Sequence, residues 1–183
     1  MGVIKTLPVA ALCGLTVAAC VPNGTPPNTG APASTRSEAT ARLLDPTGRQ
    51  LAVASAVQQN EGLRISVNAS GLRPGSYGLH VHSVGRCDGP DFTSAGPHWN
   101  PTMRQHGSLN PQGTHRGDLP NLIVGANGQG EIAFTIPEAR LSGGVGGMLD
   151  ADGAAIVAHA GPDDYRTDPS GNSGARIGCG VFG

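Results

Sequence analysis

Short runs in which apolar and polar residues alternate are the most regular feature of this sequence of 183 residues. Leucine, isoleucine and valine alternate with polar residues over positions 63–68, and isoleucine and phenylalanine do so over 132–136. Alternation with a period of two is typical of a β-strand with one buried face. Three more short apolar runs are compatible with strands, at positions 51–57, 122–124 and 154–158.

Turn residues separate these runs. Asn127 and Gly128 lie between two of the candidate strands, and Asp152 and Gly153 precede the last one, as is typical of hairpin turns. No stretch shows a convincing helical periodicity with caps, and the 29 glycines and 15 prolines fall between the short runs. The sequence therefore predicts an all-β fold that is rich in loops.

Two long regions, about Gly85 to Leu119 and Gly161 to Arg176, show no strand pattern. Long connections without regular structure are uncommon in a compact domain and usually carry function. These two loops are therefore the first places to look for a site.

The N-terminus carries a lysine and then an apolar run from Leu7 to Ala19, directly before Cys20. This run is shorter than the ~20 residues that a membrane-spanning helix needs and contains Pro8, so we interpret positions 1–19 as a signal peptide. The residues before Cys20 resemble the bacterial lipoprotein processing motif, which predicts a lipid on Cys20. Plain secretion with a free Cys20 is the alternative.

Positions 20–37 contain mainly proline, asparagine, glycine, threonine and serine, with almost nothing apolar to bury. This composition is typical of a flexible linker, here one attached to a lipid anchor. The remaining residues, 38–183, have the length of one domain with a hydrophobic core of its own.

The formal net charge of −1 and the absence of blocks of like charge argue against a nucleic-acid or other polyanionic partner. The only lysine is Lys5, within the predicted signal peptide. The substrate is therefore expected to be small, and every basic residue of the mature protein is an arginine.

The four cysteines also point to export. Cys13 leaves with the signal peptide and Cys20 takes the lipid, so Cys87 and Cys179 remain to form a disulfide. An oxidising compartment suits such a pair, and two unrelated buried thiols are the alternative.

His80 and His82 occupy alternate positions of a short predicted strand, so their imidazoles point to one face while Leu79 and Val81 point to the core. Such a pair is also an ordinary feature of a solvated strand. The spacing of His115 and Asp118 lets an imidazole and a carboxylate reach one ion, and three imidazoles with a carboxylate suit tetrahedral zinc. The remaining histidines lie in or beside the long loops: His98, His106 and His159.

The ordered series of these segments resembles the copper- and zinc-dependent superoxide dismutases. The resemblance implies a Greek-key β-sandwich or barrel of about eight antiparallel strands. It extends from about Glu38 to Gly183 and rests on five segments: Gly78–His82, Ala95–His98, Gly117–Pro120, His159 with Pro162–Asp164, and Gly174–Val181.

The resemblance also implies the ligands of two metals, with His98 bridging them as an imidazolate. In the family's pattern copper is held by four histidines: His80, His82, His98 and His159. Zinc is held by three histidines and a carboxylate: His98, His106, His115 and Asp118.

Three further roles follow from the same resemblance. Asp163 matches a carboxylate that accepts hydrogen bonds from the outer nitrogens of His80 and His106. Arg176 matches an arginine that holds a small anion beside copper, and Cys87 with Cys179 matches the family's intrasubunit disulfide.

The implied reaction is the dismutation of superoxide to dioxygen and hydrogen peroxide, with copper cycling between Cu(II) and Cu(I) and a structural zinc. His98 is expected to leave copper on reduction and to supply a proton to the peroxide. A non-enzymatic periplasmic copper- and zinc-binding protein is the alternative function.

The expected location is the periplasm or cell envelope, with the membrane reached through the anchor at Cys20 and with monomer and homodimer both open. Several relatives carry lysines in the loop before the arginine, whereas positions 165–173 contain none here. Arg166 and Arg116 are candidates to attract the substrate instead, unless both are simply solvated.

Overall fold

The computed structural model describes residues 1–3 and 36–183. Nearly all of the predicted signal peptide, the predicted lipidation site Cys20 and positions 20–35 of the predicted linker lie outside the described residues. Among the residues that are described, no helix is both long and apolar enough to span a bilayer.

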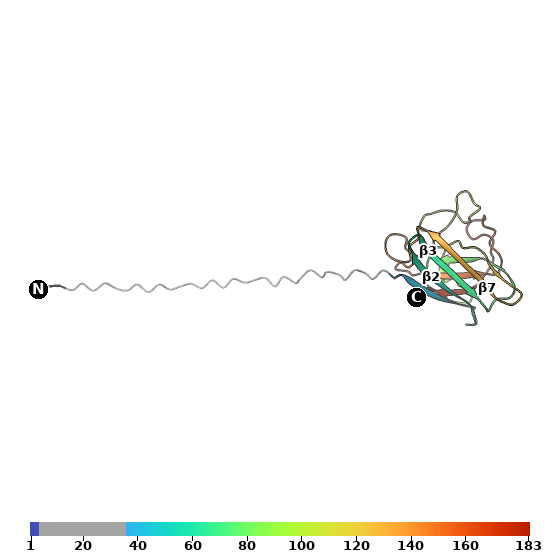
Figure 1. Cartoon of the computed structure of the whole chain (residues 1–183), viewed down its shortest axis with the longest axis horizontal. Coiled ribbons are helices and arrows are strands. Elements are labelled where there is room, and N and C mark those ends of the chain that lie inside the picture. The colour runs from blue at the N-terminus through green and yellow to red at the C-terminus, as the bar shows by residue number, and fades with distance from the viewer. Residues whose placement is uncertain (4–35) are drawn as a thin grey trace. The chain divides into compact units, whose positions relative to one another are not determined.

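Residues 36–183 form an antiparallel β-structure, which confirms the predicted all-β class (Figure 1). A single 3-10 turn, η1, covers Thr93–Ala95. Nine strands are found where about eight were expected: β1 (Glu38–Leu44), β2 (Gln50–Gln59), β3 (Gly62–Ala69), β4 (Gly75–Tyr77), β5 (Leu79–His82), β6 (Leu122–Val124), β7 (Gly130–Pro137), β8 (Ala155–His159) and β9 (Arg176–Val181).

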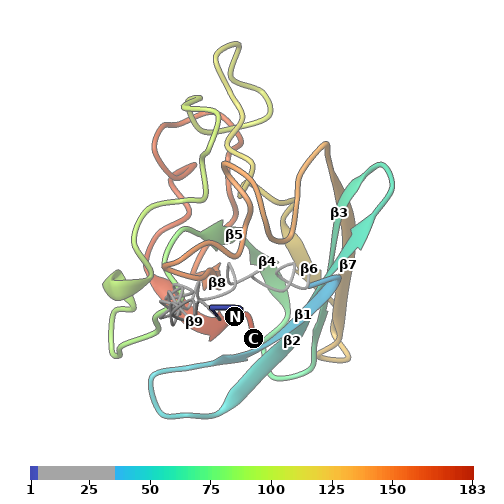
Figure 2. The same cartoon turned by 90° about the vertical axis from the view of Figure 1, so that its left-hand side faces the viewer.

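The strands follow the order β4-β6-β7-β3-β2-β1-β9-β8-β5 in one sheet. Its two edge strands, β4 and β5, are consecutive in the chain and are separated only by Gly78. The sheet therefore curls into a nearly closed barrel (Figure 2). The pairs β3–β7 and β1–β9 join strands that are far apart in the sequence, as the predicted Greek-key arrangement requires.

The two clearest alternating runs of the sequence are direct neighbours in the sheet. Leu63 pairs with Ile136, and Ile65 pairs with Phe134. The β3 members are fully buried, and each buried aliphatic side chain of this size contributes about 1.5 to 3 kcal/mol to folding. Matching apolar faces therefore fix the register of β3 against β7.

Strands β1 and β9 are absent from the pattern-based prediction for two different reasons. In β1 the buried positions include Ala39 and Ala41, whose small side chains give a weak alternation signal. In β9 the chain alternates with glycine, because a Cβ at Gly180 would lie 2.6 Å from the carbonyl oxygen of Arg42 in β1. Close approach of the backbones replaces side-chain packing there.

The two predicted long loops are confirmed as irregular segments, apart from η1 and isolated bridges. They lie on the same side of the barrel and reach over β5 (Figure 2). Residues 138–154 form a third long connection, so Asp152 and Gly153 end a loop instead of forming the tight hairpin that the sequence indicated.

Candidate metal centre

Strand β5 presents two different faces. Leu79 and Val81 are fully buried in the hydrophobic core, as predicted. His80 and His82 point to the other face but are also fully buried, because the first long loop packs on them. The solvated-strand alternative for this pair is therefore wrong.

The first long loop docks on β5 through backbone hydrogen bonds that extend the sheet pattern. Val81 donates to Gly117 O at 2.8 Å, Trp99 donates to Val81 O at 2.8 Å, and Gly117 donates to Trp99 O at 2.9 Å. This docking places His98 opposite His82 and Asp118 opposite His80. Residues about 20 positions apart in the loop are thereby brought to one place.

One group of ligand atoms comes from four buried histidines. Each offers one ring nitrogen, and these nitrogens lie within 4.8 Å of one another. His80 Nδ1, His82 Nε2 and His159 Nε2 have no hydrogen-bond partner although they are buried. A buried nitrogen without a partner is costly unless it binds a metal, so the group fits a cation. Its members are His80, His82, His98 and His159.

The outer nitrogens of three of these histidines are fixed. His82 Nδ1 lies 2.8 Å from Gly96 O, His159 Nδ1 lies 3.0 Å from Gly174 O, and His80 Nε2 lies 2.8 Å from Asp163 Oδ2. Donation to these oxygens leaves a lone pair on each inner nitrogen. The tautomers that bind metal are thus set before any metal arrives.

A second group surrounds Asp118 Oδ1. The Nδ1 atoms of His98, His106 and His115 lie 2.9, 3.0 and 3.1 Å from this oxygen. Convergence of three imidazoles and one carboxylate fits a tetrahedral cation site. His98 belongs to both groups, and the use of its Nδ1 here leaves Nε2 for the four-histidine group.

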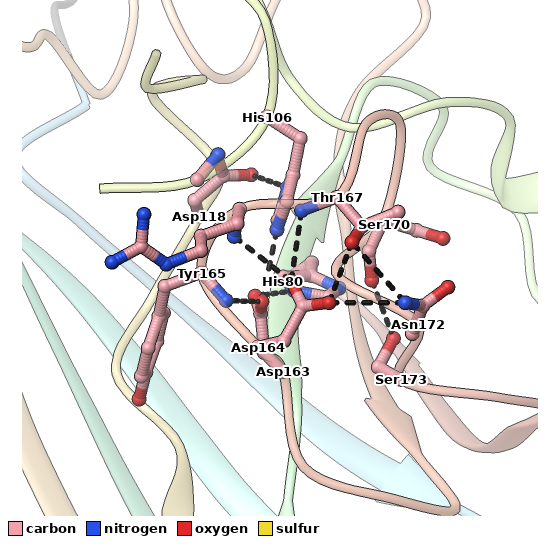
Figure 3. A network of polar contacts seen from close by, with 12 residues as sticks. His80, His106, Asp118, Asp163, Asp164, Tyr165, Thr167, Ser170, Asn172 and Ser173 are labelled. Carbon is pink, nitrogen blue, oxygen red and sulfur yellow. Dashed lines mark hydrogen bonds and ion pairs between the residues drawn. The ribbon is translucent and has the colours of Figure 1, made fainter. Parts of the chain in front are cut away.

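Asp163 connects the two groups by contacting the outer ring nitrogen of one histidine in each (Figure 3). Its Oδ2 contacts His80 Nε2, and its Oδ1 lies 3.0 Å from His106 Nε2. Gly171 has no room for a side chain, because a Cβ there would lie 1.8 Å from Asp163 Oδ1. The carboxylate is therefore enclosed between the loop and the two imidazoles.

Asn121 is a site residue that sequence analysis missed. Its side chain donates to Asp163 O at 2.9 Å and accepts from Asp163 N at 2.8 Å, while its backbone N–H donates to Tyr165 Oη. Tyr165 N in turn donates to Asp163 Oδ1 at 2.6 Å. A lone asparagine before a short strand gives no local signal of this role.

The two groups differ in their protonation. Burial lowers the pKa of His80 to about 3, of His82 to about 2 and of His159 to about 4, and it also lowers the pKa of His98. These imidazoles are neutral and ready to bind a metal.

His106 behaves in the opposite way. Burial acts to lower its pKa, but contacts with the carboxylates of Asp118 and Asp163 outweigh burial and raise the pKa to about 9. The same contacts hold the pKa of both carboxyl groups below the usual range, against the effect of burial. A cation that binds here must therefore displace a proton from His106.

Arg176 begins β9 and lies beside the four-histidine group. Its guanidinium donates to Phe92 O at 2.8 Å and to Gly96 O at 2.9 Å. The predicted disulfide between Cys87 and Cys179 is present, with a Cα–Cα distance of 5.6 Å. The disulfide joins β9, the strand that carries Arg176, to the loop whose carbonyl groups accept hydrogen bonds from Arg176.

An open cleft leads to the four-histidine group, and His98, His159 and Arg176 line it. The two arginines expected to attract the substrate do not line this cleft. Arg116 donates to Pro137 O and Arg166 donates to Leu109 O at 3.4 Å, both elsewhere on the surface.

The arginine that does line the cleft besides Arg176 is Arg104, which sequence analysis missed. Asn100 holds its backbone from both sides, at 2.8 and 3.0 Å. Its guanidinium has no hydrogen bond or ion pair with any residue in the described part of the chain.

Residues 51–182 match the sequence pattern of the copper/zinc superoxide dismutases. The chain belongs to this family. It is 37% identical to a Cu-Zn superoxide dismutase of Deinococcus radiodurans, over 98% of this chain and 96% of that protein. It is 50% identical to a superoxide dismutase-like protein of Bacillus subtilis, over 67% of this chain but only 64% of that protein.

A solved structure of a superoxide dismutase-like protein from Bacillus subtilis has the same fold. The TM-score is 0.73 at 43% sequence identity, covering 78% of this chain and 96% of that one. Membership confirms the predicted family and its barrel, and it makes copper and zinc the metals for which the two groups of ligands are suited.

Proposed function

We propose that this protein is a superoxide dismutase in which the four-histidine group holds copper and the group around Asp118 holds zinc. The observation that carries the proposal is the convergence of ligand atoms on two neighbouring points that share His98: buried ring nitrogens without a partner at one, and three imidazoles around Asp118 Oδ1 at the other. An all-imidazole set suits copper in both oxidation states, whereas an added carboxylate suits zinc, which has no redox chemistry.

When bound, copper supplies one-electron chemistry, alternating between Cu(II) and Cu(I) while one superoxide becomes dioxygen and a second becomes hydrogen peroxide with two protons. We propose that His98 donates one of these protons. It lines the cleft, so its Nε2 can pass a proton toward a bound anion. Its Nδ1 stays among the zinc ligands, which fixes the ring for that task.

Arg176 has a separate task in this proposal. Two of its donors are used by Phe92 O and Gly96 O, so the side chain is held in one orientation at the wall of the cleft. A guanidinium has five N–H donors, and the remaining ones are available for a small anion. A fixed positive charge beside His98 and His159 favours superoxide at the place where it reacts.

Asp163 fixes both ligand groups in this proposal, since its two oxygens contact the outer nitrogens of His80 and His106. Asn121 and Tyr165 hold Asp163 in turn. The zinc then has a structural role, keeping the ring of His98 and the loop that carries it in place.

The test combines metal content with superoxide consumption on purified protein that spans residues 38–183. We expect copper and zinc to bind at one equivalent each and the loaded protein to consume superoxide. Full occupancy of both metals without activity would contradict the enzyme and favour the non-enzymatic copper- and zinc-binding alternative.

We further propose that the mature chain begins at Cys20, is lipidated there and works in the periplasm or cell envelope. The apolar run before Cys20 and the disulfide between Cys87 and Cys179 support this location. Mass spectrometry of the mature N-terminus is expected to find a diacylglycerol on Cys20, and an unmodified start at another residue would contradict the anchor. A homodimer stays a prediction that gel filtration at several concentrations tests.

A further inference from the structure

The outer nitrogens of the metal-site histidines have partners with one exception. His80 and His106 contact Asp163, while His82 and His159 contact backbone carbonyls. His98 needs no outer partner, because it belongs to both ligand groups. That leaves His115, whose Nε2 has no hydrogen bond to any of the described residues.

A carboxylate that the proposed function does not use lies close to this nitrogen. Asp168 Oδ1 lies 4.0 Å from His115 Nε2. The same oxygen accepts the backbone N–H of His106 at 2.6 Å. Asp168 therefore touches the backbone of one zinc-site histidine and approaches the side chain of another, from a loop that carries neither.

We propose that Asp168 is a positioning residue of the zinc site, serving as the outer acceptor of His115 and the anchor of the His106 backbone. This inference rests on the proposed function, in which the group around Asp118 holds zinc. A histidine that binds zinc through Nδ1 carries its proton on Nε2 and almost always donates it to a carboxylate, a carbonyl or water.

The distance of 4.0 Å is longer than a hydrogen bond, but the exposure of the Asp168 side chain leaves it free to move closer. The Asp168 side chain is 49% exposed and lines the cleft with His115. A small shift of this half-exposed side chain, or one bridging water, connects its carboxylate to Nε2.

The turn from Asp164 to Asn172, which contains Asp168, is held by a network of hydrogen bonds among Asp164, Thr167 and Asn172 (Figure 3). Asp164 accepts from Thr167 N at 2.8 Å and from Thr167 Oγ1 at 2.6 Å, and Asn172 Nδ2 donates to the same carboxylate at 3.0 Å. Ser170 N closes the turn on Thr167 O at 3.2 Å. The carboxylate of Asp168 thus projects from a fixed turn toward the zinc loop.

The test measures zinc affinity by competition with a chelator, using zinc alone and protein that retains its disulfide. Asp168→Asn keeps an oxygen for the His106 N–H but removes the charge facing His115, and Asp168→Ala removes both. We expect the zinc dissociation constant to rise about 10-fold in the first variant and between about 10- and 100-fold in the second. Asp168→Glu should recover part of the loss.

Asp150→Asn is the matched control. Asp150 lines the same cleft and its Oδ1 accepts the N–H of Asp152 at 3.0 Å, so this variant makes the same charge change at a residue with no hydrogen bond or ion pair to the zinc-site residues. We expect its zinc affinity to stay within about twofold of wild type, because solvent and salt screen a charge that makes no direct contact with the zinc-site residues. An equal loss in Asp150→Asn would overturn the proposal in favour of a general charge effect.

A second measurement distinguishes positioning of His115 from general loosening of the loop. Nitrogen–proton NMR of zinc-loaded wild type is expected to show a protected Nε2–H on His115, which exchanges faster in Asp168→Ala while the Nε2–H of His106 keeps its protection. Unchanged zinc affinity in both Asp168 variants would overturn the proposal. Loss only in Asp168→Ala would overturn its His115 part. None of these measurements needs superoxide turnover, so a zinc-binding but inactive wild type would refute the proposed function alone.

Discussion

The two ligand groups are built by different parts of the molecule. The four-histidine group takes three members from strands β5 and β8, His80, His82 and His159, whereas the group around Asp118 comes entirely from a loop. The strand ligands have lowered pKa values, while the loop contains His106, protonated between two carboxylates. The four-histidine group is therefore largely preset by the barrel, whereas the group around Asp118 needs a cation to replace the proton on His106.

The largest expected effect comes from removing the carboxylate on which the loop group converges. In Asp118→Ala the three Nδ1 atoms lose their shared anionic neighbour, and Thr114 Oγ1 and His115 N lose their acceptor. We expect zinc affinity to fall by about 100-fold or more, since a metal ligand and its neighbours are lost together.

The comparison predicts that copper binding suffers much less in Asp118→Ala. Isothermal titration with each metal separately measures both affinities. His106→Ala is the control within the same group and should also weaken zinc. An equal loss of copper affinity in Asp118→Ala would mean that the strand ligands are not preset.

Arg176→Ala should affect turnover and leave both metals bound. The side chain is not among the grouped ligand atoms, but it lines the cleft and its donors are held by backbone carbonyls. Loss of one fixed donor group that stabilises a developing anion costs about 100-fold in rate in other enzymes. We expect a fall of about 10- to 100-fold in kcat/KM.

The measurement is superoxide consumption at matched metal content, with Arg116→Ala as the control. Arg116 is a partly exposed arginine bound to Pro137 O, away from the cleft. Unchanged turnover in Arg176→Ala would show that the arginine assignment is wrong.

In the metal-free protein, the two groups are expected to change the folding stability with pH in opposite directions. The raised pKa of His106 contributes stability that is full below about 6.5 and is lost as the pH rises through about 9. The lowered pKa values of His80 and His159 act the other way, so stability is lost as the pH falls below 6.5 toward 3 to 4.

Urea unfolding of the disulfide-bonded, metal-free protein at pH 5, 7 and 9 measures this dependence. We expect the highest stability near pH 7 and a decrease on the order of 1 to 3 kcal/mol at each extreme. His106→Gln should abolish the alkaline decrease and leave the acidic one. A variant that still loses stability at pH 9 would assign the alkaline loss to other groups.

The strands that the sequence predicted are those with large buried side chains. The alternation at Leu63 and Ile65 predicts β3, but the alanines of β1 and the glycines of β9 do not give a comparable pattern. Pairing of β3 with β7 depends on contacts between residues about 70 positions apart, which periodicity cannot specify. The topology was predictable only through the family resemblance.

Within the site, too, some residues could be predicted from the sequence and others could not. The family motifs predicted which side chains come together in the two groups. Asn121, Arg104 and Asp168 were missed, because their contacts depend on how one loop packs on another. Arg166 and Arg116 were plausible by position, but their side chains contact backbone carbonyls away from the cleft.

The smallest expected effect concerns how the anion reaches the four-histidine group. Arg104 lines the cleft and its guanidinium is free of partners in the described part of the chain, so its charge acts on the approaching anion through solvent. Arg104→Gln should lower kcat/KM by about two- to threefold at low ionic strength, and the difference should vanish in about 1 M salt, where the Debye length is about 3 Å.

Arg166→Gln makes the same charge change outside the cleft and should leave the salt dependence unaltered. A twofold loss in Arg104→Gln that persists at high salt would point to altered packing of the Asn100 turn instead of attraction. A loss in Arg166→Gln of the same size would mean that the net charge of the whole protein guides the anion. Because the chain has no lysine beyond Lys5, a salt-sensitive loss confined to Arg104→Gln would identify Arg104 as the arginine that replaces lysine in this task.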